Sequence, residues 1–227
     1  MEAFSPLFLI HLGAFQIPIT SSVIVQWAII IILAILAKFF TSSMKKIPDK
    51  KQSVIEIIVE AVRNLVTENM GKEYVSFIPY VGTLAIYILV MNIAPVMIGV
   101  RAPTEDLSVA VGLALITFVL VQFNSIKKNG LGRYFGAYTK PVVPLLPINI
   151  IERIVLPVSL SLRLFGNVTA GAVIISMVYK GLGNMAWFSQ LLIPIPLHAF
   201  FDLFDGSIQM IVFVMLTIMN IKVIAED

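Results

Sequence analysis

The chain has 227 residues, of which 59% are hydrophobic and 13% charged, and its mean hydropathy is +0.96. Soluble domains are about half apolar and about a quarter charged, so this composition indicates a protein that crosses a membrane several times. The net charge of +3 needs no nucleic-acid partner, because the basic residues cluster between apolar runs, and the absence of cysteine excludes disulfides and thiol catalysis.

The first apolar run follows a segment without Lys or Arg, "MEAFSPLFLIHLGAF". That segment lacks the positively charged start of a secretory signal peptide. We therefore expect the run to remain in the protein as a transmembrane helix over residues 22–41. A second helix is predicted over residues 52–71, where Ser53 and Glu56 have the spacing of a capping box. Its apolar residues share one face, which favours an amphipathic helix in the cytoplasmic interface, although packing against a partner's soluble domain would produce the same pattern.

Two further spans are predicted over residues 76–100 and 105–126, the second with Thr104 as its N-cap. Two longer helices follow, over residues 148–180 and 187–222. The last apolar run covers about 50 Å at 1.5 Å per residue, against a bilayer core of about 30 Å, so it must tilt, break or extend beyond the bilayer. Pro194 and Pro196 predict that its first part is irregular.

The predicted fold is thus an all-α polytopic membrane protein that forms a single membrane domain over residues 1–227. It has about five transmembrane helices and one amphipathic helix on the cytoplasmic side. Lys and Arg concentrate in the loops after the first and third spans, which hold Lys45, Lys46, Lys50, Lys51, Lys127, Lys128, Arg133 and Lys140. Because cytoplasmic loops carry an excess of basic residues, we expect the N-terminus outside and the C-terminus in the cytoplasm.

Arg163 is the most unusual residue of the chain, because it lies within a long apolar segment. On a helical wheel, its direction is shared to within about 40° by residues with polar or small side chains: Asn149, Glu152, Ser159, Asn167 and Ala170. Gly166 and Ala170 would let a neighbouring helix approach closely. An intramembrane arginine costs about 2.5–3.5 kcal/mol even on lenient insertion scales, so it usually indicates an ion route. A structural ion pair with Glu152 or Asp202 is the alternative.

The final apolar segment has a polar stripe of its own. Its members are spaced four, three and four residues apart, within about 60° of arc on an α-helix: His198, Asp202, Asp205 and Gln209. Asn220 continues the stripe. Two carboxylates, an imidazole and an amide on one face could form a hydrated path, although Asp205 could also be solvated near the outer surface and His198 could be an interfacial residue.

The segments "SLSLRLFGNVTAG" (residues 159–171) and "GSIQMIVFVMLT" (residues 206–217) closely resemble subunit a of F-type ATP synthases, as do "PTEDL" and "INIIERI". The resemblance covers most of the chain. It implies an ion-translocating stator subunit that offers two offset half-channels to the carboxylates of a c-subunit ring. It also implies a b-subunit peripheral stalk, other ATP synthase subunits and membrane lipids as partners, two strongly tilted last helices, no cofactor or metal, and no catalysis by this chain alone.

The resemblance also implies roles for individual residues. Arg163 matches the family's essential arginine, Asn167 the asparagine one turn later, Gln209 the glutamine facing the arginine, and Glu152 the acid near the start of the same helix. Asp202 stands where relatives carry Glu or His, and Ala172 stands where some relatives carry an acid or a histidine. Our hypothesis is that Asp202 and Asp205 together serve the outer path, with His198 and Ser159 as further path residues.

Three other classes of function remain possible from the residues alone. A secondary transporter could use Arg163 as an anchor for an anionic substrate, but it would usually show an internal repeat, and none is seen. A membrane enzyme would need a catalytic constellation, and neither HExxH nor GxSxG occurs. A purely structural subunit would tolerate loss of Arg163. We expect the multi-pass chain in a bacterial plasma (inner) membrane.

Overall fold

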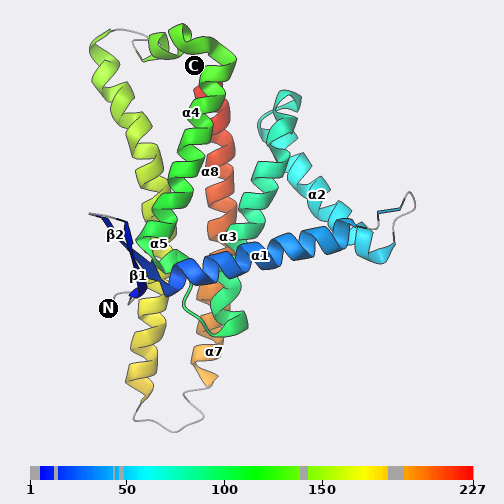
Figure 1. Ribbon diagram of the computed structural model, residues 1–227, viewed down its shortest axis with the longest axis vertical. Coiled ribbons are helices and arrows are strands. Elements are labelled where there is room, and N and C mark those ends of the chain that lie inside the picture. The colour runs from blue at the N-terminus through cyan, green and yellow to red at the C-terminus, as the bar shows by residue number, and fades with distance from the viewer. Residues whose placement is uncertain are drawn as a thin grey trace. The chain divides into compact units, whose positions relative to one another are not determined.

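The structure is a computed structural model that describes residues 6–12, 15–42, 44–45, 49–138, 143–183 and 192–226 (Figure 1). Within these residues, five helical segments are long and apolar enough to cross a membrane. The predicted class, a helical membrane protein with several spans, is thereby confirmed. The chain divides into two compact units, Met1–Pro103 and Thr104–Asp227. The single domain over residues 1–227 stays a prediction.

The first unit begins with a short hairpin that the sequence analysis did not predict. Strand β1 (Pro6–Leu12) pairs with the antiparallel strand β2 (Phe15–Thr20), and Leu12 lies opposite Phe15 at the turn. Helix α1 (Ser21–Thr41) follows directly and begins one residue before the predicted span. Most of its large apolar side chains are exposed, as expected of a helix that faces lipid.

Helices α2 (Lys50–Asn69) and α3 (Ile78–Ile98) complete the first unit, joined by the 3₁₀ helix η1 (Lys72–Phe77). The predicted capping box is wrong, because α2 begins three residues before Ser53 and its N-cap is Asp49. Ser53 donates its backbone N–H to the Asp49 carbonyl, and Glu56 instead accepts from the Gln52 side chain at 2.8 Å. Helix α3 ends at Gly99, whose φ of 68° is a left-handed conformation that glycine adopts without strain.

The second unit starts with the 3₁₀ turn η2 (Pro103–Glu105) and helix α4 (Leu107–Ala137). The prediction that Thr104 caps this helix is wrong. Asp106 is the N-cap, and its carboxylate accepts from the backbone N–H of Ser108 at 3.1 Å. Helical structure continues eleven residues past the predicted end at residue 126, but the path breaks at Gly130, where φ is 74° and ψ is 158°. Only glycine adopts such a conformation readily.

The rest of the second unit consists of the 3₁₀ turn η3 (Val143–Leu145), helix α5 (Leu146–Leu182), helix α7 (Pro194–His198), the π-helix η4 (Ala199–Asp205) and helix α8 (Gly206–Glu226). The first residues of the predicted helix 187–222 lie outside the described residues. The predicted irregularity after Pro194 and Pro196 is present as the π-helix. At 37 residues, α5 covers about 55 Å, well beyond a bilayer core of about 30 Å.

The core of the second unit lies where α4 packs against α5 and α8 (Figure 1). Its buried apolar side chains come from all three helices and include Val121, Leu164, Phe213, Ile218 and Ile221. Two polar side chains of α4 satisfy carbonyls at the end of α8, which would otherwise lack partners. Ser125 donates to the Ile224 carbonyl at 2.8 Å, and Asn129 donates to the Ala225 carbonyl at 3.1 Å. These bonds hold the end of α8 against α4, and the candidate site lies between α8 and α5.

Candidate ion pathway

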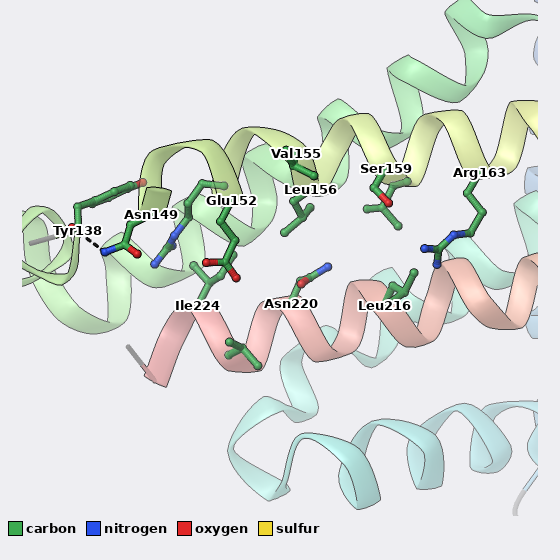
Figure 2. A pocket seen from close by; sticks show the side chains of 13 residues that line it. Tyr138, Asn149, Glu152, Val155, Leu156, Ser159, Arg163, Leu216, Asn220 and Ile224 are labelled. Carbon is green, nitrogen blue, oxygen red and sulfur yellow. Dashed lines mark hydrogen bonds between the residues drawn. The ribbon is translucent and has the colours of Figure 1, made fainter. Parts of the chain in front are cut away.

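A polar cavity of about 670 Å³ lies between α5 and α8 (Figure 2). Helix α5 contributes Asn149, Glu152, Ser159 and Arg163 to its wall, and α8 contributes Asn220. In Figure 2 the side chains of Glu152 and Asn220 point toward each other, and Arg163 reaches toward α8 at the end opposite Tyr138. The helical spacing predicted from the sequence thus places Glu152, Ser159 and Arg163 in one cavity, together with Asn149 and Asn220.

Arg163 is exposed, as is Leu162 beside it in the helix. Leu160 and Leu164 are buried and pack α5 into the core of the second unit. Within the part of the chain that the structure describes, neither Glu152 nor Asp202 forms an ion pair with Arg163. The alternative that Arg163 is one half of a structural ion pair with these residues therefore finds no support. Its charge remains available to a group outside this chain.

One turn after Arg163, an amide pair joins α5 to α8. Asn167 donates its Nδ2 hydrogen to Oε1 of Gln209 at 2.7 Å. Gln209 is only 2% exposed, whereas Asn167 is exposed. The Nε2 atom of Gln209 is buried and has no hydrogen-bond partner among the described residues. A buried N–H donor that makes no hydrogen bond is energetically costly, so Gln209 Nε2 is available to a water molecule or to an acceptor on a partner.

A second polar cluster lies where the C-terminal part of α5 meets α7 and η4. His198 Nδ1 and Asp202 Oδ2 are 2.6 Å apart, and His198 Nε2 lies 3.3 Å from the Tyr179 hydroxyl. The Asp202 side chain is 15% exposed and the His198 side chain 36%. Asp205 is half-buried and belongs to the same π-helix as Asp202. The cluster therefore links a tyrosine of α5, an imidazole and a carboxylate in one connected series.

The predicted stripe on the last helix assumed α-helical spacing throughout. The π-helix has wider turns, so the side chains on its two sides do not keep the directions that an α-helix would give them. The stripe is accordingly divided in the structure. His198 and Asp202 join Tyr179, whereas Gln209 joins Asn167.

The sequence analysis did not identify three residues with polar groups at these sites. Tyr138 and Arg153 line the cavity beyond Glu152, and Tyr179 belongs to the second cluster. Arg153 is a charged residue in an apolar helix and directly follows Glu152, so its position in the sequence could have identified it as a site residue. The roles of Tyr138 and Tyr179 depend on contacts between segments far apart in the chain, which no spacing rule could have found.

The amino-acid sequence of the chain is similar to those of known proteins. The family model described as "ATP synthase A chain" matches residues 22–222. The chain is 37% identical to "ATP synthase subunit a" of Moorella thermoacetica over 213 residues, which cover 94% of this chain and 93% of the relative. It is 34% identical over 208 residues to "ATP synthase subunit a 2" of a Bradyrhizobium species, covering 92% of this chain and 89% of the relative.

A third relative is "ATP synthase subunit a, sodium ion specific" of Propionigenium modestum, 31% identical over 225 residues. These residues cover 92% of this chain and 75% of the relative. The region matched by the family model includes the amide pair, the second polar cluster and every residue that lines the cavity except Val223 and Ile224. On this evidence the chain belongs to the ATP synthase A chain family, that of subunit a.

Proposed function

We propose that the chain provides two offset half-channels to the carboxylates of a c-subunit ring, with Arg163 as the fixed positive charge between them. Its family membership indicates that the chain is a membrane-embedded, ion-translocating subunit of an ATP synthase rather than a catalytic one. The proposed half-channels and the proposed role of Arg163 rest on one observation above all. An exposed arginine within an apolar helix stands at the end of a polar cavity.

The chemistry of arginine suits this role. Its guanidinium is effectively never deprotonated in proteins, so Arg163 cannot relay a proton and acts as a permanent charge. A protonated carboxylic acid on the ring can face lipid at modest cost, whereas a bare carboxylate cannot. Beside Arg163, the carboxylate is stabilised and the pKa of the ring's acid falls, so the ion leaves. Rotation then carries the empty site past Arg163 to the other half-channel, where it reloads.

The inner half-channel is the cavity between α5 and α8. It runs from Tyr138 and Asn149, past Glu152, Asn220 and Ser159, to Arg163. The proposed topology places the end of α8 in the cytoplasm, so this cavity opens on the cytoplasmic side. Glu152 therefore belongs to the inner path. Its carboxylate can accept or stabilise the cation, and the amides of Asn149 and Asn220 can hydrogen-bond the water that accompanies it.

The outer half-channel follows the second polar cluster. Tyr179, His198 and Asp202 form its connected part, and Asp205 lies three residues farther along the π-helix, at its junction with α8. On α5, Asn167 lies between Arg163 and Tyr179 in chain order, and its partner Gln209 follows Asp202 and Asp205. Its buried and unpaired Gln209 Nε2 donor can bind a water molecule or the ring's carboxyl group at the point of transfer.

Arg163 also separates the two paths. A cation that passed directly from one half-channel to the other would dissipate the gradient without rotation. Each unit charge that crosses 100 mV supplies about 2.3 kcal/mol, and several charges are needed for each ATP. A fixed positive charge at the junction repels a passing cation, so flux stays coupled to the movement of the ring.

We place the chain, as a multi-pass protein, in a bacterial plasma membrane, with the N-terminus outside and the C-terminus in the cytoplasm. Its proposed partners are the c-ring, the b-subunit peripheral stalk and membrane lipids. The exposed strip formed by Arg163, Gly166, Asn167 and Ala170 supports docking of the ring, because small side chains beside the arginine allow close approach.

Gradient-driven ATP synthesis by vesicles that carry the complex with Arg163→Lys tests this function. We expect synthesis to fall roughly tenfold or more, because a buried lysine can lose its proton and lacks the planar fork of arginine. Arg63→Lys is the matched control, since Arg63 is exposed on α2, belongs to the other compact unit and does not line the cavity, so it should leave synthesis unchanged. Equal activity of the two variants would refute the proposed role of Arg163.

A further inference from the structure

Helix α4 breaks at Gly130, where the backbone angles leave the helical region (Figure 1). We call the residues after this break, 131–138, the bent segment. The side chains of Gln122 and Tyr134 belong to residues twelve positions apart, yet they are joined by a hydrogen bond of 2.8 Å. On a straight helix twelve residues span about 18 Å, which is beyond the reach of these two side chains. The bent segment therefore turns back toward the earlier part of α4.

Side-chain contacts fix the direction of the bent segment, because glycine has the widest choice of backbone angles and the break at Gly130 alone does not fix it. Tyr134 is 8% exposed, and its hydroxyl lies 2.8 Å from that of Tyr138. The Tyr134 hydroxyl has a single hydrogen, which it donates to Gln122, so Tyr138 donates in this second bond. The two rings meet edge to face, with their centres 5.4 Å apart.

Arg153 of α5 contacts both tyrosine rings. The central carbon of its guanidinium lies 5.0 Å from the centre of the Tyr138 ring and 5.9 Å from that of Tyr134, within the cation–π range of about 6 Å. One turn earlier on α5, Asn149 donates its Nδ2 hydrogen to the Tyr138 carbonyl at 2.8 Å. The group formed by Arg153, Tyr134 and Tyr138, which we call the tyrosine clamp, thus joins the bent segment to the start of α5.

The tyrosine clamp forms one end of the cavity between α5 and α8. Arg153 and Tyr138 both line this cavity beside Asn149 and Glu152, and Arg163 lies at the opposite end (Figure 2). A shift of the bent segment would move part of the cavity wall and break the bond from Asn149. We propose that Arg153 is a positioning residue of the ion path, which holds the bent segment, and with it this end of the cavity, in one arrangement.

Arg153 acts in this role through Tyr138 and Asn149 rather than on the ion itself. A partly buried cation–π contact favours the closed arrangement of its partners roughly fivefold. Without that contact, the polar groups at this end of the cavity no longer keep the positions that hydrogen bonds to the ion's water require. Arg153 has this role only if the cavity is the inner half-channel, so the inference rests on the proposed function.

The first test measures the position of the bent segment in the whole complex and does not depend on ion translocation. Ile116→Cys on α4 and Leu131→Cys on the bent segment carry spin labels, since both side chains are exposed and the chain has no native cysteine. The same complex without these two cysteines corrects for labelling of other subunits. Pulsed electron paramagnetic resonance measures the distance between the labels. The measurement is repeated with Arg153→Met and with Arg133→Met, which removes an exposed charge from the bent segment itself.

We expect one narrow distribution of distances with the tyrosine clamp intact and with Arg133→Met, and a broad distribution with Arg153→Met. A narrow distribution that Arg153→Met leaves unchanged would overturn the proposal, because other contacts would then hold the bent segment. A distribution that is already broad with the clamp intact would overturn it as well.

The second test measures gradient-driven ion flux in vesicles. Arg153→Met and Tyr138→Leu should each lower the flux roughly fivefold, because each removes the cation–π contact. The double variant should be no slower than the slower single variant, since both changes remove the same contact. Tyr138→Phe keeps the ring and should retain more flux than Tyr138→Leu. Losses that multiply in the double variant, or equal losses with Phe and Leu, would contradict the role of the clamp.

Arg163→Lys separates a failure of this inference from a failure of the proposed function. If Arg163→Lys loses ATP synthesis while Arg153→Met broadens the distances but conducts normally, the positioning role is wrong and the proposed function stands. If Arg163→Lys synthesises ATP normally, the proposed function has failed and the positioning role fails with it.

Discussion

Asp202 and Asp205 lie on one turn of the π-helix, yet their surroundings differ. Asp202 is bonded to His198 at 2.6 Å, and His198 in turn contacts Tyr179. Asp205 lies closer in the chain to Gln209 and the amide pair. A proton that enters along the outer path would reach the imidazole and Asp202 first. Asp205 would then pass it toward the ring, since proton transfer requires groups within hydrogen-bond reach or one water molecule apart.

We therefore predict that Asp202→Asn and Asp205→Asn each lower gradient-driven ion flux. The loss should be roughly tenfold for Asp202, whose removal also leaves His198 without its partner, and smaller for Asp205. Flux measured in vesicles against an imposed gradient checks this. Glu60→Gln removes one exposed acid from α2 and should have no effect. If both aspartate variants conduct normally, the outer path does not run through this helix.

Three residues of the cavity could be predicted from the sequence, because a regular helix sets the directions of its side chains. A repeat of 3.6 residues placed Glu152, Ser159 and Arg163 on one face, and all three line one cavity. The same rule failed on the last helix, where the π-helix divides the predicted stripe. Tyr179 joined the site through a contact with a residue nineteen positions away, which no local pattern encodes.

Between α5 and η4, one glycine sets how closely the two elements pack. A Cβ atom at Gly171 would lie 3.1 to 3.3 Å from atoms of Phe201, tighter than ordinary van der Waals contact. Phe201 immediately precedes Asp202. The close approach therefore positions the π-helix, and with it the carboxylate of the second cluster, against α5.

We predict that Gly171→Ala lowers ATP synthesis, because overpacking costs about 1–3 kcal/mol and would displace the π-helix. Phe201→Leu in the same chain should restore part of the activity by giving the methyl group space. Gly181→Ala is the control on the same helix, since nothing lies within 4 Å of a Cβ atom there. ATP synthesis in vesicles is the readout. If the double variant is no better than Gly171→Ala, the packing argument is wrong.

The helices themselves were predicted mainly from the lengths of the apolar segments and from the positions of the prolines. The predicted starts of α1, α2, α3, α4 and α5 differ from the observed ones by one or two residues. The caps were predicted less well, because Asp49 and Asp106 compete with Ser53 and Thr104 for the same role. The Gly130 break and the hairpin depend on single backbone angles and on strand pairing, which hydropathy does not report.

For the whole molecule, the distribution of Lys and Arg determines the proposed orientation. The proposal places Lys50, at the start of α2, in the cytoplasm and Lys180, near the end of α5, outside. Both side chains are exposed. Lys140, which also contributed to the predicted orientation, lies outside the described residues.

Because the chain has no cysteine, Lys50→Cys and Lys180→Cys can each be labelled alone on this chain. We predict that a membrane-impermeant thiol reagent labels Lys180→Cys in intact cells and Lys50→Cys only in inverted vesicles. Gel analysis of this subunit after labelling checks the result. Labelling of both from the same side would contradict the orientation and, with it, the assignment of the cavity to the cytoplasmic path.

Arg163 is proposed to couple ion flux to rotation, and Arg163→Ala tests this role most directly. Gradient-driven ATP synthesis and passive ion leak are measured together in vesicles that carry the assembled complex, with assembly verified by co-purification of the c-ring and the peripheral ATPase. We predict that synthesis is lost and that the leak rises, because the fixed charge that releases the ion and seals the junction is gone. Normal synthesis with no added leak would mean that Arg163 is only a structural charge, and would contradict the proposed mechanism.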